Sequence, residues 1–181
     1  MSGHNKWSKI KHKKAATDSQ KSRVFSRYSR LITLEAKKAH GDVLSPALAA
    51  VIERAKRDSM PKENIERAVA KGISSDSTNL EELLYEAYGP GGVAILISVI
   101  TDNHNRSAPE IKNLLMKAGH PMAVPGSASW AFNKHDGNYY PTAPLELTEE
   151  VSESLAAFVE LIESHPDVQA VYTSADATLD A

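Results

Sequence analysis

Residues 83–101 read LLYEAYGPGGVAILISVIT, and they decide the fold of the second half of the chain. The run VAILISVI at 93–100 is continuously apolar, which is typical of a strand at the centre of a sheet. The glycines and proline at 89–92 predict a tight turn. We therefore expect two strands, at 83–88 and 93–101, on either side of this turn.

The residues after this pair alternate between strand and helix patterns. The order β-β-α-β-β-α-β predicts helices on one face of a mainly antiparallel sheet, close to a ferredoxin-like split βαβ fold. The later elements are a polar loop at 102–106, a helix from 107 to Gly119, strands at 127–133 and 138–140 (continued at 145–147), a helix at 148–164 and a strand at 168–173.

Local signals refine these elements. Ser107 with Glu110 fits a capping box, and Thr148 is a good cap for the second helix. The alternation in SASWAFN at 127–133 predicts a half-buried strand. It favours core packing for Trp130 and Phe132 over a stacking platform.

The first half has the periodicity of three helices. They are expected from Thr17 or Asp18 to about Ala39, from Pro46 to about Ser59, and from Met60-Pro61 to about Lys71. Ser45 would cap the second helix, and Gly41 and Gly72 would end the first and the third. The fold class is therefore α+β: a basic arm at 1–14, a helical bundle domain at 15–73, a linker, and an α/β domain at 80–176.

Composition excludes several classes of protein. The 181 residues include no cysteine, which excludes disulfides, thiolate catalysis and cysteine-ligated zinc. No apolar run reaches the length of a membrane span, and the start is too polar for a secretory signal. We expect a cytoplasmic monomer without a membrane partner.

The charges are segregated along the chain. Residues 1–40 carry a net charge of +9, whereas the other residues carry −11, and residues 135–181 contain no lysine or arginine. A cationic segment of this density favours an anionic partner, and a nucleic acid adds free energy through counterion release. A solvated basic tail is the plainer alternative, but an aromatic residue among the lysines favours base stacking.

Lysines and arginines of this segment would neutralise phosphates, and Trp7 and His12 would stack on bases or form hydrogen bonds with them. The predicted nucleic-acid-binding residues are Lys6, Trp7, Lys9, Lys11, His12, Lys13, Lys14, Lys21, Arg23 and Arg27.

Two other motifs are weaker candidates. The glycine turn precedes a strand and lacks a following Gly-Lys-Ser/Thr, so a simple turn is the plainer reading. The loop at 102–106 could hold a phosphate at a helix start or act only as a cap. We take Gly91, Gly92, Asn105 and Arg106 as possible secondary contacts with nucleic acid.

No enzyme motif stands out. The sequence contains no G-x-S-x-G and no H-x-x-x-H pair, so we predict no catalytic residues, no metal and no cofactor. The alternative of an enzyme that uses Asp102, His104 and Arg106 would require a small phosphorylated ligand.

Several blocks, in order, resemble the YebC/PmpR family between residue 3 and about 133, and 141–172 resembles the family's final helix and strand. The blocks are GH and KW within 3–7, IKHKKAA at 10–16 with Asp18, MPK at 60–62 with IERA at 65–68, YE at 85–86 with YGPGGVA at 88–94, and TDN at 101–103 with NRS at 105–107.

The resemblance implies a three-helix domain followed by α/β domains, without catalytic activity. Bacterial members of the family are described as DNA-binding transcriptional regulators. The mitochondrial relative is a translational activator, and bacterial relatives have been assigned to the ribosome.

Two features depart from the family. A further α/β module of roughly 60 residues, which the resemblance implies before the final helix, is replaced here by 133–140. The usual glycine pair after the second-domain helix is Gly119-His120.

We therefore expect a non-enzymatic regulator of gene expression, acting in translation through ribosomal RNA. A flexible arm with an aromatic residue suits unpaired RNA, and no helix-turn-helix with a polar recognition helix stands out for duplex DNA. A DNA-binding transcriptional regulator is the first alternative. A protein-interaction scaffold that uses the acidic C-terminal half is the second.

Overall fold

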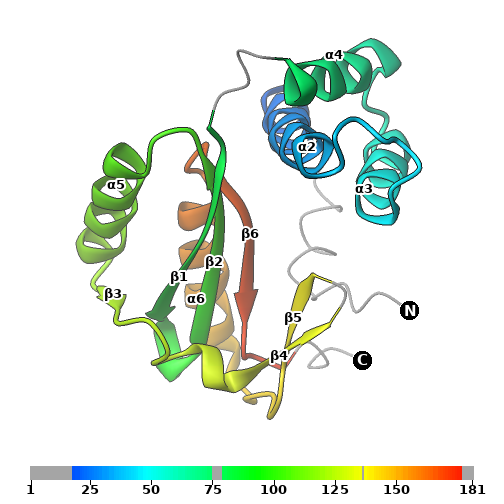
Figure 1. Cartoon of the computed structure of the whole chain (residues 1–181). Helices are drawn as coiled ribbons and strands as arrows, with labels where there is room; N and C mark the ends of the chain where they lie inside the picture. Colours follow the sequence, from blue (N-terminus) through cyan, green and yellow to red (C-terminus); the bar gives the residue numbers. More distant parts are fainter. Residues whose placement is uncertain (1–17, 75–78, 136, 177–181) are drawn as a thin grey trace. The chain divides into compact units, whose positions relative to one another are not determined.

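A computed structural model describes residues 18–74, 79–135 and 137–176 (Figure 1). These residues form two compact units. The helical unit holds residues 18–74, 79–82 and 100–104, and the α/β unit holds residues 83–99, 105–135 and 137–176. The α+β class is confirmed, whereas the domain limits drawn at 14, 73 and 80 stay predictions. None of the helices in the described ranges has both the length and the hydropathy of a bilayer-spanning segment.

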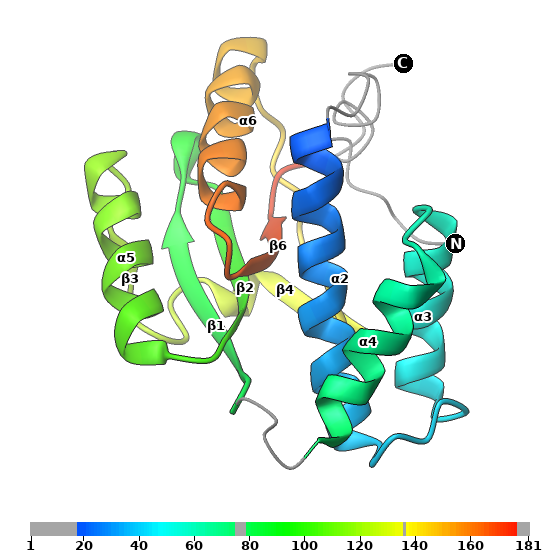
Figure 2. The same ribbon diagram turned by 90° about the horizontal axis from the view of Figure 1, so that it is seen from above.

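Three helices make up the helical unit (Figure 2). They are α2 (Asp18–Lys38), α3 (Pro46–Arg57) and α4 (Lys62–Ile73). Their apolar faces meet in one core, because residues three or four positions apart share a face of a helix. The buried members of this core are Ile32, Ala36, Leu48, Val51, Ala55, Met60, Ile65 and Ala68.

The glycines predicted to end α2 and α4 have different roles. Gly41 adopts a φ of +83° and its N–H donates to the Ala36 carbonyl at 2.9 Å, so it ends α2 as predicted. Gly72 instead lies buried inside α4. A Cβ at this position would lie 2.5 Å from the carbonyl oxygen of Thr33 and 2.8 Å from the Ala36 Cβ. The prediction that Gly72 closes the helix is wrong, because this glycine lets α4 approach α2 at backbone contact distance.

Ser45 does not act as a side-chain cap. Pro46 opens α3, as predicted, but the Ser45 hydroxyl makes no capping hydrogen bond. The fixed φ of proline is compatible with a first helical turn and supplies the start signal by itself.

A four-stranded sheet in the order β3-β1-β2-β6 forms the centre of the α/β unit. The apolar run becomes β2, one of the two inner strands, as predicted. Strand β6 pairs with β2 antiparallel, with Ile97 opposite Val171. The elements are β1 (Glu81–Tyr88), β2 (Ala94–Thr101), α5 (His104–Lys117), β3 (Met122–Ala123), β4 (Phe132–His135), β5 (Asn138–Pro141), α6 (Glu149–Glu163) and β6 (Val168–Thr173), with 3-10 turns η1 (Pro90–Gly92) and η2 (Ser129–Ala131).

The two faces of this sheet are covered differently, because alternate residues of a strand point to opposite sides. Ile95 and Ile97 pack into a core with α5 and α6, which lie on the same face of the sheet (Figure 1). Leu96 packs on the other side with Phe132 of β4. Strands β4 and β5 pair only with each other in a two-stranded sheet.

Helix α5 begins three residues earlier than predicted. It starts at His104, after a turn in which the Thr101 hydroxyl accepts a 3.1 Å hydrogen bond from the Asn103 N–H. Ser107 is therefore inside the helix and fully buried, and its hydroxyl donates to the Asp167 carboxylate at 2.5 Å. The capping-box prediction is wrong, because a partner distant in sequence takes the hydroxyl.

The predicted strand at 127–133 is wrong over most of its length. A turn and η2 occupy this region, and β4 starts only at Phe132. The buried carboxylate of Glu86 accepts hydrogen bonds from the N–H groups of Gly126, Ala128 and Ser129, at 2.7, 2.6 and 2.9 Å. Backbone donors that point at one carboxylate cannot also form a strand ladder.

The last elements agree with the predictions except at one point. The Thr148 hydroxyl accepts a 3.4 Å hydrogen bond from the Val151 N–H and caps α6, and β6 has the predicted bounds. Leu145, expected to continue β5, instead forms a parallel bridge with Ala175. This part of the chain therefore runs beside the end of β6.

Candidate nucleic-acid interface

Most of the predicted binding residues belong to the arm before α2. Seven of them lie outside the described residues, so their roles stay predictions. They are Lys6, Trp7, Lys9, Lys11, His12, Lys13 and Lys14.

Helix α2 carries the other three predicted residues, on two different faces. Each residue of an α-helix turns by about 100°, so Lys21 and Arg23 point roughly 200° apart. Arg23, Arg27 and Arg30 fall into one row at spacings of four and three, roughly opposite the buried Ile32. Lys21 and Arg23 are exposed and Arg27 is partly exposed. The structure therefore does not gather Lys21, Arg23 and Arg27 into a single patch.

Tyr28 lies on the other of these two faces of α2, the face that carries Lys21. Its hydroxyl donates a 2.5 Å hydrogen bond to the Asp58 carboxylate, just after α3. Burial raises the pKa of Tyr28 far above its usual range, and the hydrogen bond to Asp58 raises it further. The charges of Arg54 and Arg57 act in the opposite direction, which places both guanidinium groups within Coulomb range of Tyr28.

Arg54 and Arg57 are exposed residues of the last turn of α3. Neither forms an ion pair with another residue of the described part of the chain. Lys21 shares the Tyr28 face of α2, because seven residues make about two helical turns. We define the Tyr28 surface as Lys21, Tyr28, Arg54 and Arg57.

Arg54 and Arg57 were missed in the sequence, because they lie outside the cationic segment of residues 1–40. The usable signal was the spacing of three between these arginines in ERAKR, which puts both on one face. Cations in a last turn also stabilise the helix dipole of α3. Their position beside Tyr28 depends on the packing of α2 against α3.

The four possible secondary contacts fall at opposite ends of β2. Gly91 and Gly92 lie in the turn before this strand, and Asn105 and Arg106 follow it. Eight strand residues separate the two pairs by roughly 25 Å. A Cβ on Gly91 would lie 2.6 Å from Val151 Cγ1, so this glycine serves the packing of the turn against α6.

The Arg106 guanidinium forms ion pairs with two carboxylates. Its guanidinium lies 2.7 Å from the buried Asp167 carboxylate and 3.0 Å from Glu110. Because Asp167 is fully buried, an unpaired charge there would be costly, and Arg106 compensates it. Arg106 therefore joins α5 to the α6–β6 turn, and the geometry disfavours it as a phosphate ligand.

Glu110, His165 and Asp167 present ligand atoms within 4.8 Å of one another, the kind of cluster that could hold a metal ion. The His165 Nδ1 already accepts a 3.2 Å hydrogen bond from the Asp167 N–H, and its Nε2 lies 3.1 Å from Glu110. Arg106 adds a positive charge at the same carboxylates. A cation would have to displace these partners, so the group fits a structural network better than a metal site.

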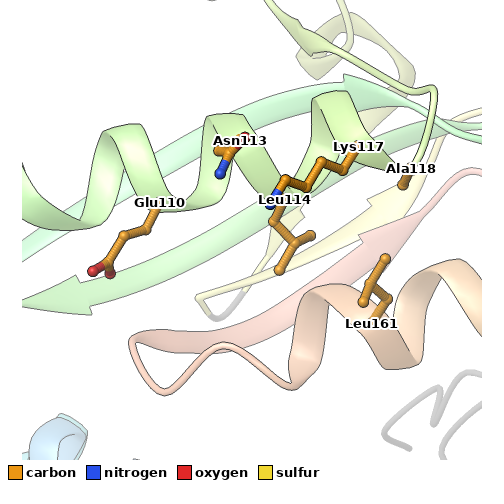
Figure 3. Close-up of a pocket in the computed structure, with 6 residues that line it drawn as sticks. All are labelled: Glu110, Asn113, Leu114, Lys117, Ala118 and Leu161. Carbon is orange, nitrogen blue, oxygen red and sulfur yellow. The ribbon is translucent and has the colours of Figure 1, made fainter.

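A shallow hollow of about 320 Å³ lies between α5 and α6 (Figure 3). Leu114 and Leu161 form its apolar part, and Glu110 and Lys117 lie along α5 beside it. None of its lining residues is a serine, histidine or tyrosine that could act as a nucleophile or base. Its ionisable residues are Lys117 and Glu110, and Glu110 is paired with Arg106 and His165.

Comparison with known proteins identifies the family. Residues 5–75 match the model of the TACO1/YebC protein N-terminal domain, and residues 80–137 match the model of the TACO1/YebC second and third domain. The chain belongs to the TACO1/YebC family. This membership confirms the resemblance found in the sequence.

The family's curated members provide closer comparisons. A probable transcriptional regulatory protein of Petrotoga mobilis is 45% identical over 162 residues, which cover 88% of this chain and 63% of the relative. A protein of the same name from Trichlorobacter lovleyi is 40% identical over 175 residues, which cover 96% of this chain and 70% of the relative. A third, from Dictyoglomus thermophilum, is 48% identical over 134 residues, which cover 73% of this chain and 54% of the relative. The chain thus spans between about half and 70% of the length of these TACO1/YebC relatives.

A solved structure supports the fold. The crystal structure of the conserved hypothetical protein Aq1575 from Aquifex aeolicus matches with a TM-score of 0.80 and 25% identity, covering 92% of this chain and 95% of that one. In this chain, β4 and β5 occupy the position at which the resemblance predicted a missing module, and that absence stays a prediction.

Proposed function

We propose that this TACO1/YebC chain is a nucleic-acid-binding regulator of gene expression that acts in translation through contacts with ribosomal RNA. The basic N-terminal region makes these contacts, and the Tyr28 surface extends them onto the folded helical unit. The observation that carries the proposal is that Arg54 and Arg57, both exposed, lie within Coulomb range of Tyr28 on the helix that follows the cationic arm. Clustered exposed cations of this kind neutralise backbone phosphates.

RNA is favoured over duplex DNA by the chemistry of the region. Sequence-specific readers of duplex DNA insert a helix with polar residues into the major groove. About half of the exposed residues of α2 and α3 are lysine or arginine, which suits backbone contacts. Unpaired RNA instead offers bases that can stack on aromatic side chains such as Trp7.

A DNA-binding transcriptional regulator is the second candidate. It is favoured by the name shared by the Petrotoga, Trichlorobacter and Dictyoglomus relatives, which describes probable transcriptional regulatory proteins. The same cations would then contact phosphates of a duplex. The two candidates differ in which nucleic acid retains the protein at physiological salt.

Co-sedimentation with ribosomes, against excess competitor duplex DNA and across a salt series, separates these candidates. Retention on ribosomes at physiological salt despite the competitor supports the translational function. Release by the duplex, with tighter binding to particular sequences, supports the transcriptional one. Absence of binding to either nucleic acid would refute both.

Charge reversal tests the arm in the same assay. Lys11→Glu, Lys13→Glu and Lys14→Glu together should weaken binding and flatten its salt dependence. Reversal of three exposed lysines elsewhere, Lys62, Lys71 and Lys112, changes the net charge equally and serves as the matched control. Equal losses in both triple variants would mean that net charge, rather than the arm, determines binding.

A further inference from the structure

Trp130 presents an indole ring to solvent at a fixed orientation. Its side chain is 69% exposed, although the sequence predicted a place in the core. The indole N–H donates to the Ser127 carbonyl at 2.8 Å and lies 3.2 Å from the Tyr88 hydroxyl. Because its single polar group is satisfied within the chain, the ring offers a partner only its apolar π surface.

The segment beneath Trp130 is firmly held. Glu86 is 6% exposed, and its carboxylate accepts hydrogen bonds from the backbone N–H groups of Gly126, Ala128 and Ser129. The Tyr88 hydroxyl also donates to the Ser127 carbonyl. A ligand that covers the indole therefore immobilises little additional chain, so the ordering cost of binding is small.

The charges around this segment differ from those of the rest of the α/β unit. Residues 118–145, which follow α5, contain one lysine and one acid, Asp136, whereas residues 146–176 contain eight acids and no lysine or arginine. Lys134 is exposed on β4 and lies over the Tyr139 ring, 5.4 Å from its centroid. The stretch that carries Trp130 therefore lacks the acidic excess of residues 146–176, and its exposed Lys134 suits an anionic ligand.

We propose that Trp130 is a stacking site for an unpaired base of a single-stranded nucleic acid, with Lys134 contacting the backbone. Every base has a π face, so an exposed indole accepts bases with little sequence preference. A duplex keeps its bases stacked on one another, which leaves only backbone contacts for this site. The inference rests on the proposed nucleic-acid function and adds a contact in the α/β unit that discriminates single strands from duplexes.

Intrinsic fluorescence provides a direct test. The chain contains two tryptophans, Trp7 and Trp130, so the Trp7→Phe variant reports on Trp130 alone. We expect a labelled single-stranded oligonucleotide to quench this fluorescence as it binds. The same oligonucleotide with abasic positions, or annealed to its complement, should bind with little quenching.

Anisotropy of the labelled strand separates the possible failures. No binding of any strand by the natural chain refutes the proposed function itself. Binding by anisotropy without a change in Trp130 fluorescence overturns the stacking site and leaves the proposed function intact. Equal quenching by the duplex, or by an unrelated protein in place of the strand, also overturns the site.

A variant series in the otherwise natural chain provides the second measurement. Trp130→Ala should weaken single-strand binding by about 5- to 150-fold and leave duplex binding unchanged, whereas Trp130→Phe should retain part of the affinity. Val124→Ala is the matched control, because Val124 is an apolar side chain that is 73% exposed in the same segment. Similar melting temperatures would show that both variants fold, and equal losses for single strand and duplex would contradict the inference.

Discussion

The hydroxyl of Tyr28 in α2 donates a 2.5 Å hydrogen bond to the carboxylate of Asp58, the residue that follows α3. This contact joins residues thirty positions apart. It fixes the end of α3 against the middle of α2, and so it positions Arg54 and Arg57 beside Tyr28.

Tyr28→Phe should destabilise the helical unit by about 1.5–3 kcal/mol, because it removes one hydrogen bond to a charged group and keeps the ring. The raised pKa of Tyr28 adds a pH dependence. The unfolded chain loses this proton above a pH of about 10, whereas the folded chain keeps it. Stability should therefore fall as the pH rises above that value.

Urea denaturation at pH 7 and pH 11 measures both effects. The Phe variant should show a smaller loss of stability between the two pH values than the natural chain. Tyr139→Phe is the control, because Tyr139 lies in β5 of the α/β unit and takes no part in the Tyr28–Asp58 contact. An equal pH response in the natural chain and Tyr28→Phe would contradict the role of this hydroxyl.

Reversal of Arg54 and Arg57 to Glu should weaken binding to nucleic acid and reduce its salt dependence. Each lost phosphate contact lowers the slope of log K against log salt by about 0.7 for single strands and 0.9 for duplexes. Binding isotherms at four salt concentrations give the slope. The double variant Lys62→Glu with Lys71→Glu on α4 is the matched control. If both double variants gave the same slope of log K against log salt, Arg54 and Arg57 of α3 would not be part of the interface.

Glu86→Gln should destabilise the α/β unit by about 1–3 kcal/mol, because three backbone donors lose a charged acceptor. Burial acts to raise the pKa of Glu86, but the N–H groups of Gly126, Ala128 and Ser129 together outweigh it and hold the pKa below its usual range. A depressed carboxyl pKa stabilises the fold above the unfolded value and loses this contribution as the pH falls.

Denaturation midpoints of the natural chain and Glu86→Gln should therefore converge as the pH is lowered from 7 to 3. The exposed Glu82→Gln serves as a control and should change stability little. If the difference between the natural chain and Glu86→Gln stayed constant over this pH range, the ionised carboxylate would not be what holds residues 126–129.

Gly72→Ala should destabilise the helical unit, although alanine is normally the better helix former by about 1 kcal/mol. The new methyl group would meet the Thr33 carbonyl at 2.5 Å, so α4 must move away from α2, at a cost of about 1–3 kcal/mol. Ala70→Gly, at an exposed position of α4, shows the propensity effect alone. Thermal unfolding of both variants checks the prediction, and a more stable Gly72→Ala protein would contradict it.

Errors in the sequence-based prediction arose where a distant partner overrode a local signal. Ser107 and Glu110 have the spacing of a capping box, but Asp167 takes the Ser107 hydroxyl. SASWAFN alternates like a strand, but Glu86 takes its backbone donors. Both acids are buried residues on other elements, and no pattern near the affected residues indicates them.

The sequence predicted only part of the candidate interface, because it shows where cations are concentrated along the chain and not which of them share a surface. The concentration of cations before residue 40 is a property of the sequence, and it is the basis on which Lys21, Arg23 and Arg27 were predicted. The helical turn of about 100° per residue separates Lys21 from Arg23, whereas the packing of α3 against α2 brings Arg54 and Arg57 beside Tyr28.

The sequence by itself determined the α+β class, the three helices, the central strand and the segregation of charge. These features follow from periodicity, glycine and proline positions, and composition, all of which act over a few neighbouring residues. Only the tertiary structure decided that Trp130 is exposed, that Gly72 lies between two helices and that Arg106 compensates the charge of Asp167. Each of these depends on contacts between residues far apart in the chain, which form when the elements pack against one another.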